Sequence, residues 1–72
     1  MEILINKTKV KILVSNKNLD KKIDCRNCSG LIIDYSPSVD FYTVEFEYID
    51  KDGEIDTDIA FLKKEEFLII AW

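Results

Sequence analysis

The clearest pattern in the chain is an alternation of apolar and acidic residues between Thr43 and Ala60. In its first half, the apolar residues Val44, Phe46 and Tyr48 are separated by Glu45 and Glu47. Successive side chains of a strand point to opposite faces, so this period predicts a strand with an apolar inner face and an acidic outer face. An Asp-Gly pair at 52–53, typical of a hairpin turn, follows this strand.

The second half of the pattern predicts a partner strand with Ile55 and Ile59 facing inward. A loop over residues 50–53 would place Glu47 opposite Asp56 and Glu45 opposite Asp58. A turn made by residues 52–53 alone would place Glu47 opposite Asp58. Either register leaves five acids on one face, as a comb at two-residue spacing: Glu45, Glu47, Glu54, Asp56 and Asp58.

The rest of the chain predicts more strands and a single helical turn. Val10, Ile12 and Val14 alternate with other residues and are expected to face inward, and a long polar loop follows over 16–29. Pro37 marks a turn over 36–40, because proline cannot donate to a ladder. The predicted fold class is all-β in one domain, 1–72, with strands near 9–14, 30–36, 41–49, 54–61 and 67–71 and a 3-10 turn over 63–66.

The order of these features resembles a known group of folds. The features are the Gly-Leu-Ile-Ile run from Gly30, the Tyr-Thr-Val-Glu-Phe run from Tyr42, the Asp-Gly turn, and the final Glu-Glu-Phe-Leu-Ile-Ile run. In this spacing the chain is similar to the SH3-like small barrels, which include KOW and Tudor domains. The resemblance implies a five-stranded SH3-like small barrel with a 3-10 turn before the last strand. It carries no function by itself.

Composition and charge narrow the functional classes. The chain has a net charge of −4, and this charge is unevenly spread: residues 1–30 hold seven Lys/Arg and three Asp/Glu, whereas residues 31–72 hold three and eleven. Such asymmetry points to a partner that is attracted by complementary charge. No apolar run is long enough for a membrane span and no secretory signal is evident, so a cytoplasmic protein without membrane contact is expected.

Two cysteines are the weak candidates for a metal site. Cys25 and Cys28 have zinc-knuckle spacing, but a structural zinc needs four ligands and the chain has no histidine and no other cysteine. Reduced thiols are the favoured interpretation; a zinc shared by two chains and a disulfide are the alternatives. No cofactor is expected.

The sequence argues against an enzyme. It has no histidine for general base catalysis or for activating a cysteine or serine. The aromatic residues Tyr35, Phe41, Tyr42 and Tyr48 could bind cations or bases, although core packing is the simpler interpretation for Tyr42 and Tyr48. Phe41 has outward parity, so it is the aromatic residue predicted to contact a partner.

The acidic face supports the leading hypothesis for function. Carboxylates two residues apart stand about 6.8 Å from one another, close to two nucleotide rises of DNA. The small size and acidity resemble those of phage proteins that inhibit host enzymes acting on DNA. A non-enzymatic phage or mobile-element inhibitor is therefore expected to cover the nucleic-acid-binding surface of a host protein such as a sliding clamp, RNA polymerase, CRISPR nuclease or DNA-repair enzyme. Its partner-binding residues would be the five acids and Phe41, and it would not itself bind DNA or RNA.

Two alternatives and one assembly prediction remain. Neutralisation of the acidic face within the chain would leave a housekeeping adaptor without charge-based recognition. A nucleic-acid-associated KOW-like module would instead use the basic residues of the N-terminal half: Lys7, Lys9, Lys11, Lys17, Lys21, Lys22 and Arg26. The apolar chain ends predict a homodimer formed through terminal strands, using residues 3–5, Leu68, Ile69, Ile70 and Trp72.

Overall fold

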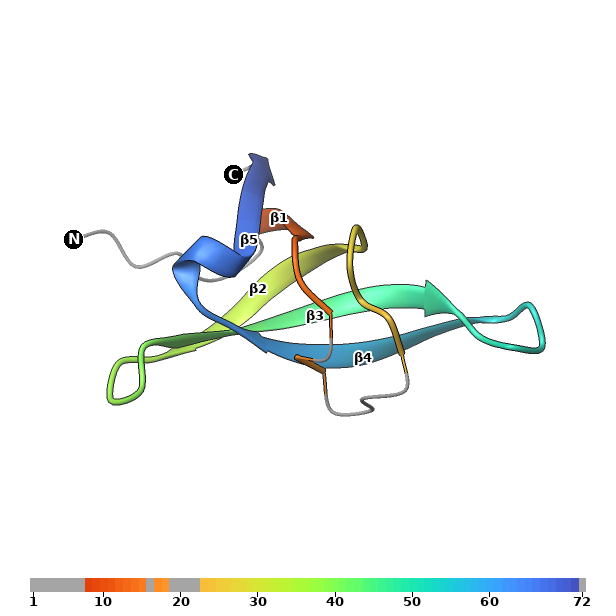
Figure 1. Cartoon of the computed structure of the whole chain (residues 1–72), viewed down its shortest axis with the longest axis horizontal. Helices are drawn as coiled ribbons and strands as arrows, with labels where there is room; N and C mark the ends of the chain where they lie inside the picture. The colour runs from red at the N-terminus through yellow and green to blue at the C-terminus, as the bar shows by residue number, and fades with distance from the viewer. Residues whose placement is uncertain (1–7, 16, 19–22, 72) are drawn as a thin grey trace.

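The structure is a computed structural model that describes residues 8–15, 17–18 and 23–71. Its five strands form one antiparallel sheet in the order β4-β3-β2-β1-β5 (Figure 1). No described residues pair β4 with β5, so the sheet is open at these two edges. The elements are β1 (Thr8–Ile12), β2 (Ser29–Ser36), β3 (Phe41–Ile49), β4 (Ile55–Leu62), the 3-10 turn η1 (Lys64–Glu66) and β5 (Phe67–Ala71).

This architecture confirms the all-β prediction, including the 3-10 turn before the last strand. The predicted strand bounds agree to within two residues; the largest difference is in β1, which ends at Ile12 rather than at Val14. The predicted loop over 16–29 lies partly outside the described residues.

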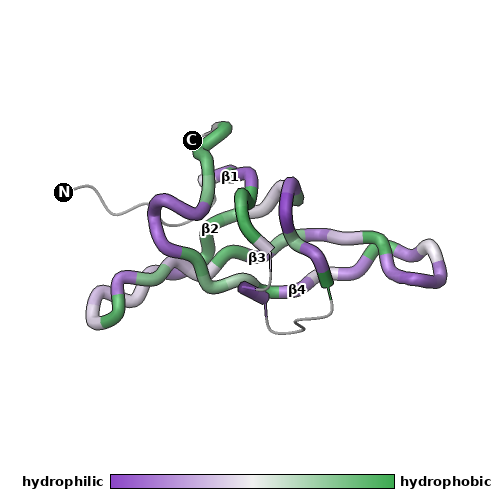
Figure 2. Tube along the Cα trace, in the orientation of Figure 1, coloured by the Kyte–Doolittle hydropathy of each residue, from purple (hydrophilic) through white to green (hydrophobic). Residues whose placement is uncertain are grey.

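The hydrophobic core lies on one side of the sheet, here called the inner face. Tyr42 is at its centre, with the Tyr35 ring 4.5 Å away and the Phe67 ring 5.4 Å away and edge-on. Figure 2 shows the apolar positions along the strands and the hydrophilic tip of the β3–β4 hairpin. The buried core residues are Val10, Ile12, Cys25, Ile32, Tyr42, Val44, Phe46, Ala60, Leu62 and Phe67.

Gly30 lets β2 and β3 approach closely at the centre of the sheet. It pairs with Val10 on one side and Phe46 on the other. A Cβ atom at this position would lie 2.6 Å from Val44 Cγ1 and 2.8 Å from the Glu45 carbonyl oxygen. Both distances are shorter than van der Waals contact, so the position requires glycine for space.

The turn between β3 and β4 is a three-residue loop closed by Asp50 and Glu54. The Asp50 N–H donates to the Glu54 carbonyl (2.8 Å), and the Gly53 N–H donates to the Asp50 carbonyl (3.0 Å). Asp50 Oδ1 accepts from the N–H groups of Asp52 and Glu54, both at 2.9 Å. Gly53 has a φ of 81°, which glycine adopts at little steric cost. This pattern fits a type I turn followed by a left-handed residue.

This loop makes both registers expected from the sequence wrong. Four-residue and two-residue loops each differ from it by one residue, and a one-residue shift turns every side chain of a strand to the other face. Glu47 is opposite Thr57, and Glu45 is opposite Ile59. The predicted pairs of facing carboxylates are therefore not formed.

The shift also reverses the predicted faces of β4. Ile55 and Ile59, expected to face inward, lie on the face away from the core, here called the outer face, and Ile55 is 71% exposed. Ala60 and Leu62 take the buried positions, opposite Val44 and Tyr42. Leu62 lies where β4 crosses the core, whereas Ile55 lies near the hairpin tip. The observed register therefore buries the side chain that is next to the core.

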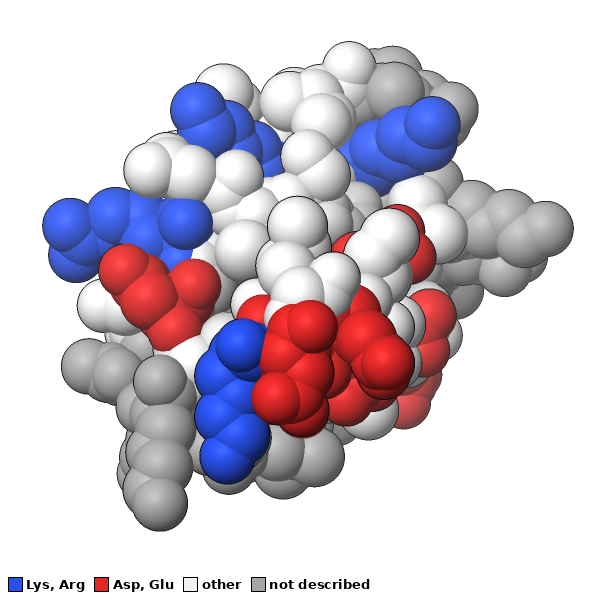
Figure 3. Space-filling model, turned by 90° about the vertical axis from the view of Figure 1, so that its right-hand side faces the viewer, with Lys and Arg blue, Asp and Glu red and all other residues white. Residues whose placement is uncertain are grey.

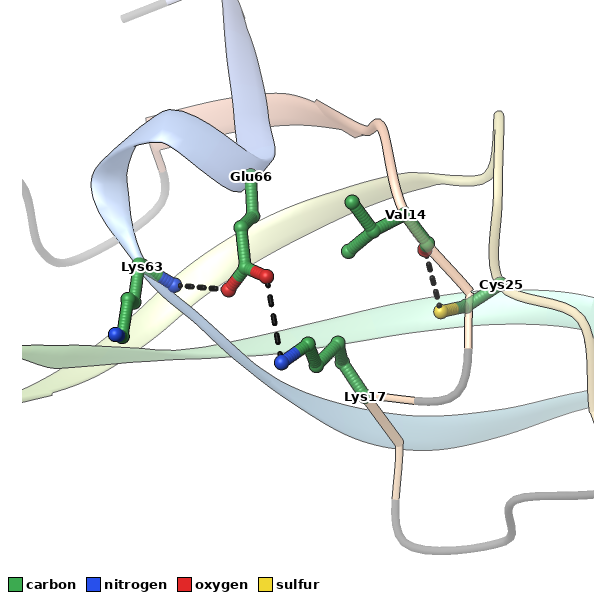
Figure 4. A network of polar contacts seen from close by, with 5 residues as sticks. All are labelled: Val14, Lys17, Cys25, Lys63 and Glu66. Carbon is green, nitrogen blue, oxygen red and sulfur yellow. Dashed lines mark hydrogen bonds and ion pairs between the residues drawn. The ribbon is translucent and has the colours of Figure 1, made fainter.

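Part of the β4 edge is covered by a segment that follows β1. The Phe61 N–H donates to the Lys17 carbonyl (2.8 Å), and Asn18 forms a bridge with Ala60. Glu66 ties this segment to η1: its carboxylate contacts Lys17 Nζ at 3.3 Å and accepts from the Lys63 N–H at 2.8 Å (Figure 4). The Leu13 N–H donates to the Glu66 carbonyl (3.0 Å), so Glu66 links three parts of the chain.

We expect Gly30→Ala to destabilise the protein by about 1–3 kcal/mol, because the added methyl group must displace Val44 or the β3 backbone. Urea unfolding followed by circular dichroism measures this change. Ser29→Ala, at the neighbouring exposed position, is the control and should change stability by less than about 0.5 kcal/mol. Equal stability of the two variants would contradict the close approach at Gly30.

Candidate functional site

The most distinctive surface of the molecule is the acidic β3–β4 hairpin, residues 45–58. It carries seven carboxylates and a single basic residue, Lys51. The molecule is elongated, 41 × 23 × 16 Å, and the hairpin tip forms one end of its long axis (Figure 1). Figure 3 looks onto this end, where acidic side chains gather with a basic side chain at their margin. The carboxylates are Glu45, Glu47, Asp50, Asp52, Glu54, Asp56 and Asp58.

The structure does not bring the five predicted acids onto one face. Glu45 and Glu47 are exposed on the outer face, as expected. Asp56 and Asp58 are opposite Tyr48 and Phe46, so they lie on the inner face. The expected single-faced comb is wrong because the loop has three residues. The hairpin instead carries carboxylates on both faces and at its tip.

The two inner-face acids have different surroundings: Asp58 is opposite the buried Phe46, and Asp56 lies nearer the exposed tip. Asp58 is half-buried and accepts a hydrogen bond from Asn18 Nδ2 at 3.1 Å. Asp56 is exposed; its Oδ2 lies 3.4 Å from the Tyr48 hydroxyl, and its Oδ1 accepts from the Thr57 N–H at 2.8 Å. These two carboxylates therefore have local partners within the chain.

At the tip, Asp50 and Asp52 join the acidic group without having been predicted. Asp50 has a structural role, since its carboxylate accepts two backbone N–H groups. Its sequence signal was an aspartate three residues before a glycine, the arrangement that type I turns favour. Asp52 and Glu54 are exposed, and no ion pair joins either of them to a described residue.

Phe41 lies at the opposite end of β3 from the hairpin tip. Glu45 is four residues further along the strand, about 14 Å at the usual rise per residue, and Ile49 at the hairpin end is about 27 Å away. The Phe41 ring is half-buried, with Lys63 Nζ 5.8 Å from the ring centre. The other aromatic candidates do not form a cage either, because Tyr42 is buried and Tyr35 packs on it.

The cysteine loop is packed against the core. Cys25 is fully buried, and its Sγ donates to the Val14 carbonyl at 3.2 Å (Figure 4). Both thiols are free, and a zinc shared between chains would require Cys25 to leave the core. Burial, with smaller contributions from Cys25 and Asp24, raises the pKa of Cys28. The described residues contain no group of three or more potential metal ligands.

The described basic residues of the KOW-like alternative are dispersed. Lys9 and Lys11 are exposed on the outer face of β1, and Arg26 is exposed in the cysteine loop. Lys17 forms an ion pair with Glu66. The remaining three, Lys7, Lys21 and Lys22, lie outside the described residues.

No protein-family model, no curated protein and no solved structure matches the chain. Its function must therefore be inferred from its own residues. In the described part of the chain, none of the helical structure has the length and apolar character needed to cross a membrane.

We expect Asp50→Ala to lower the free energy of unfolding by about 1 kcal/mol, because it leaves two backbone N–H groups of the turn without their side-chain acceptor. Asp52→Ala is the matched control: it removes the same charge from the adjacent turn and should change stability by less than about 0.5 kcal/mol. Thermal and urea unfolding of both variants test this. An equal effect would mean that charge, rather than hydrogen bonding, governs the turn.

The cysteines should react slowly with iodoacetamide. A raised pKa lowers the thiolate fraction of Cys28 at any given pH, and burial shields Cys25. At pH 8 we expect Cys28 to react more slowly than the same residue in urea-unfolded protein, and Cys25 to react only on unfolding. Mass spectrometry of the two sites measures the rates. Fast modification of Cys25 in the folded protein would contradict its place in the core.

Proposed function

We propose that this chain is a non-enzymatic protein-binding module that inserts its acidic hairpin into a basic, nucleic-acid-binding channel of another protein. The observation that carries the proposal is the projecting hairpin with seven carboxylates and one lysine, a balance of −6 over residues 45–58. A patch of one sign on a projecting element attracts an oppositely charged cleft and speeds association.

The arrangement of the acids favours insertion over flat docking. Glu45 and Glu47 point from one face of the hairpin, and Asp56 and Asp58 from the other. A flat basic surface would meet only one of these pairs. A channel lined by Lys and Arg on two sides, such as one that holds a nucleic-acid strand, would meet both pairs and the tip.

The candidate partner classes follow from this chemistry. Sliding clamps, RNA polymerases, CRISPR nucleases and DNA-repair enzymes all hold nucleic acid in basic channels or grooves, and a phage or mobile-element inhibitor of a host protein is the role that such binding fits best. The setting would be cytoplasmic. The chain itself, with its net charge of −4, should not bind DNA or RNA.

We also infer that the fold is an open variant of the SH3-like small barrels. The strand order β4-β3-β2-β1-β5 and the 3-10 turn before β5 support this assignment. In this fold the third and fourth strands form the acidic hairpin. The fold alone does not determine the function.

The proposal predicts that neutralising the hairpin tip weakens binding without unfolding the chain. The variant is Asp52→Asn/Glu54→Gln/Asp56→Asn, in which each amide keeps a carbonyl acceptor. Its control, Asp34→Asn/Asp40→Asn/Glu65→Gln, changes the net charge equally outside the acidic hairpin. We expect the hairpin variant to slow association with the partner roughly tenfold and the control to have little effect. Both should stay within about 1 kcal/mol of the original stability.

The partner is sought by affinity capture from nuclease-treated bacterial lysate, followed by binding kinetics with the purified protein. A captured nucleic-acid-binding protein that short duplex DNA displaces, and that the hairpin variant captures poorly, would support the proposal. Equal capture by the hairpin variant and its control would overturn it. So would direct binding of the chain to DNA at physiological salt.

A further inference from the structure

The outer face of the sheet carries more apolar surface than a solvated sheet face needs. The described residues include eight large hydrophobic side chains that are exposed. Strand alternation places five of them on the outer face: Ile49, Ile55, Phe61, Leu68 and Ile70. No described element covers this face, since the core lies entirely on the other side. A concentration of exposed apolar side chains marks an interaction surface.

Charges on the same face are arranged symmetrically about β2. The pairing register forms a row across four strands, from Lys9 on β1 through Leu31 on β2 and Glu45 on β3 to Ile59 on β4. In the next row Lys11 pairs with Ser29, and Glu47 pairs with Thr57. Lysines therefore flank β2 on one side and glutamates on the other, each one strand spacing of about 4.8 Å away.

Three of these four charges, Lys9, Glu45 and Glu47, line a shallow groove. The groove has a volume of about 460 Å³, and its lining includes Lys9, Leu31, Glu45, Glu47 and Ile70. No ion pair within the described part of the chain joins the two lysines to the two glutamates. The face thus presents complementary charges that are available to another molecule.

We infer that the outer face binds a second copy of this chain. A two-fold axis that runs parallel to β2, between the two facing sheets, exchanges the β1 and β3 sides. It places Lys9 of one copy over Glu45 of the other, and Lys11 over Glu47. Leu31 meets its own counterpart near the axis. Self-complementarity of this kind is the defining property of a two-fold interface.

The apolar flanks match under the same operation. The β4 strand of one copy faces the β5 strand of the other. Ile59 then approaches Ile70 in the row of Lys9 and Glu45, and Thr57 approaches Leu68 in the row of Lys11 and Glu47. Two sheets packed face to face in this way form a sandwich with aligned strands. The dimer thus uses Leu68 and Ile70 of the predicted terminal surface, but through the sheet face rather than by edge pairing. The dimer does not rest on the proposed function: it covers Glu45 and Glu47, whereas Asp52, Glu54 and Asp56 lie outside this face.

Charge exchange gives a specific test. We expect the unmodified protein to sediment as a dimer, and the variants Lys9→Glu/Lys11→Glu and Glu45→Lys/Glu47→Lys to sediment as monomers, with dissociation constants raised roughly 100-fold. Mixing the two variants should restore a dimer, because every facing pair again has opposite charges. Arg26→Glu/Lys64→Glu has the same charge change as the first variant but lies off the face, and it should remain dimeric.

A measurement on the unmodified protein removes any dependence on how the variants fold. An equal mixture of ¹⁴N- and ¹⁵N-labelled protein, treated with a carbodiimide, should yield Lys9–Glu45 or Lys11–Glu47 cross-links, half of which carry both labels. A monomer at high protein concentration would overturn the proposal. Cross-links without mixed labels, or a mixture of folded charge variants that stays monomeric, would do the same.

Discussion

The register between β3 and β4 is the constraint on which the rest of this structure depends. It is set by the loop from Asp50 to Glu54, in which one carboxylate accepts two backbone N–H groups and Gly53 adopts a left-handed conformation. Because side chains alternate along a strand, the length of this loop decides which half of β4 reaches the core. With three residues in the loop, Leu62 is buried and Ile55 is exposed. A loop one residue longer or shorter would reverse both.

The same register determines the surface chemistry of the hairpin. The acids of β3 remain on the outer face, while those of β4 turn to the inner face, where Asp58 accepts a hydrogen bond from Asn18. This is possible because the hairpin is longer than the core beneath it, so its inner face near the tip is open to water. The result is a projecting element with negative charge on both faces, which suits a channel better than a plane.

A one-sided core has a second consequence. All ten buried core residues lie on or against the inner face. The outer face therefore carries the residues that alternate with them along the strands. On β4 and β5 those residues are mostly apolar, and β1 and β3 carry charges of opposite sign. The two proposals therefore overlap at Glu45 and Glu47, which a second copy would cover, whereas the tip and the inner-face acids stay outside the dimer face.

The sequence by itself determined the strands, because apolar alternation and turn residues are local signals. It identified the five strands to within two residues, the 3-10 turn and the inward positions Val10, Ile12, Val44 and Phe46. It also located the acidic hairpin, since charge can be counted along the chain.

The sequence could not determine how the acids are divided between two faces. An Asp-Gly pair is compatible with loops of two, three or four residues, and the side chain of Asp50 selects one of them only through hydrogen bonds formed in the folded turn. Nor could it place Cys25 in the core. That position follows from the packing of the cysteine loop against Val14 and the core, residues far apart in the sequence that only the tertiary structure brings together.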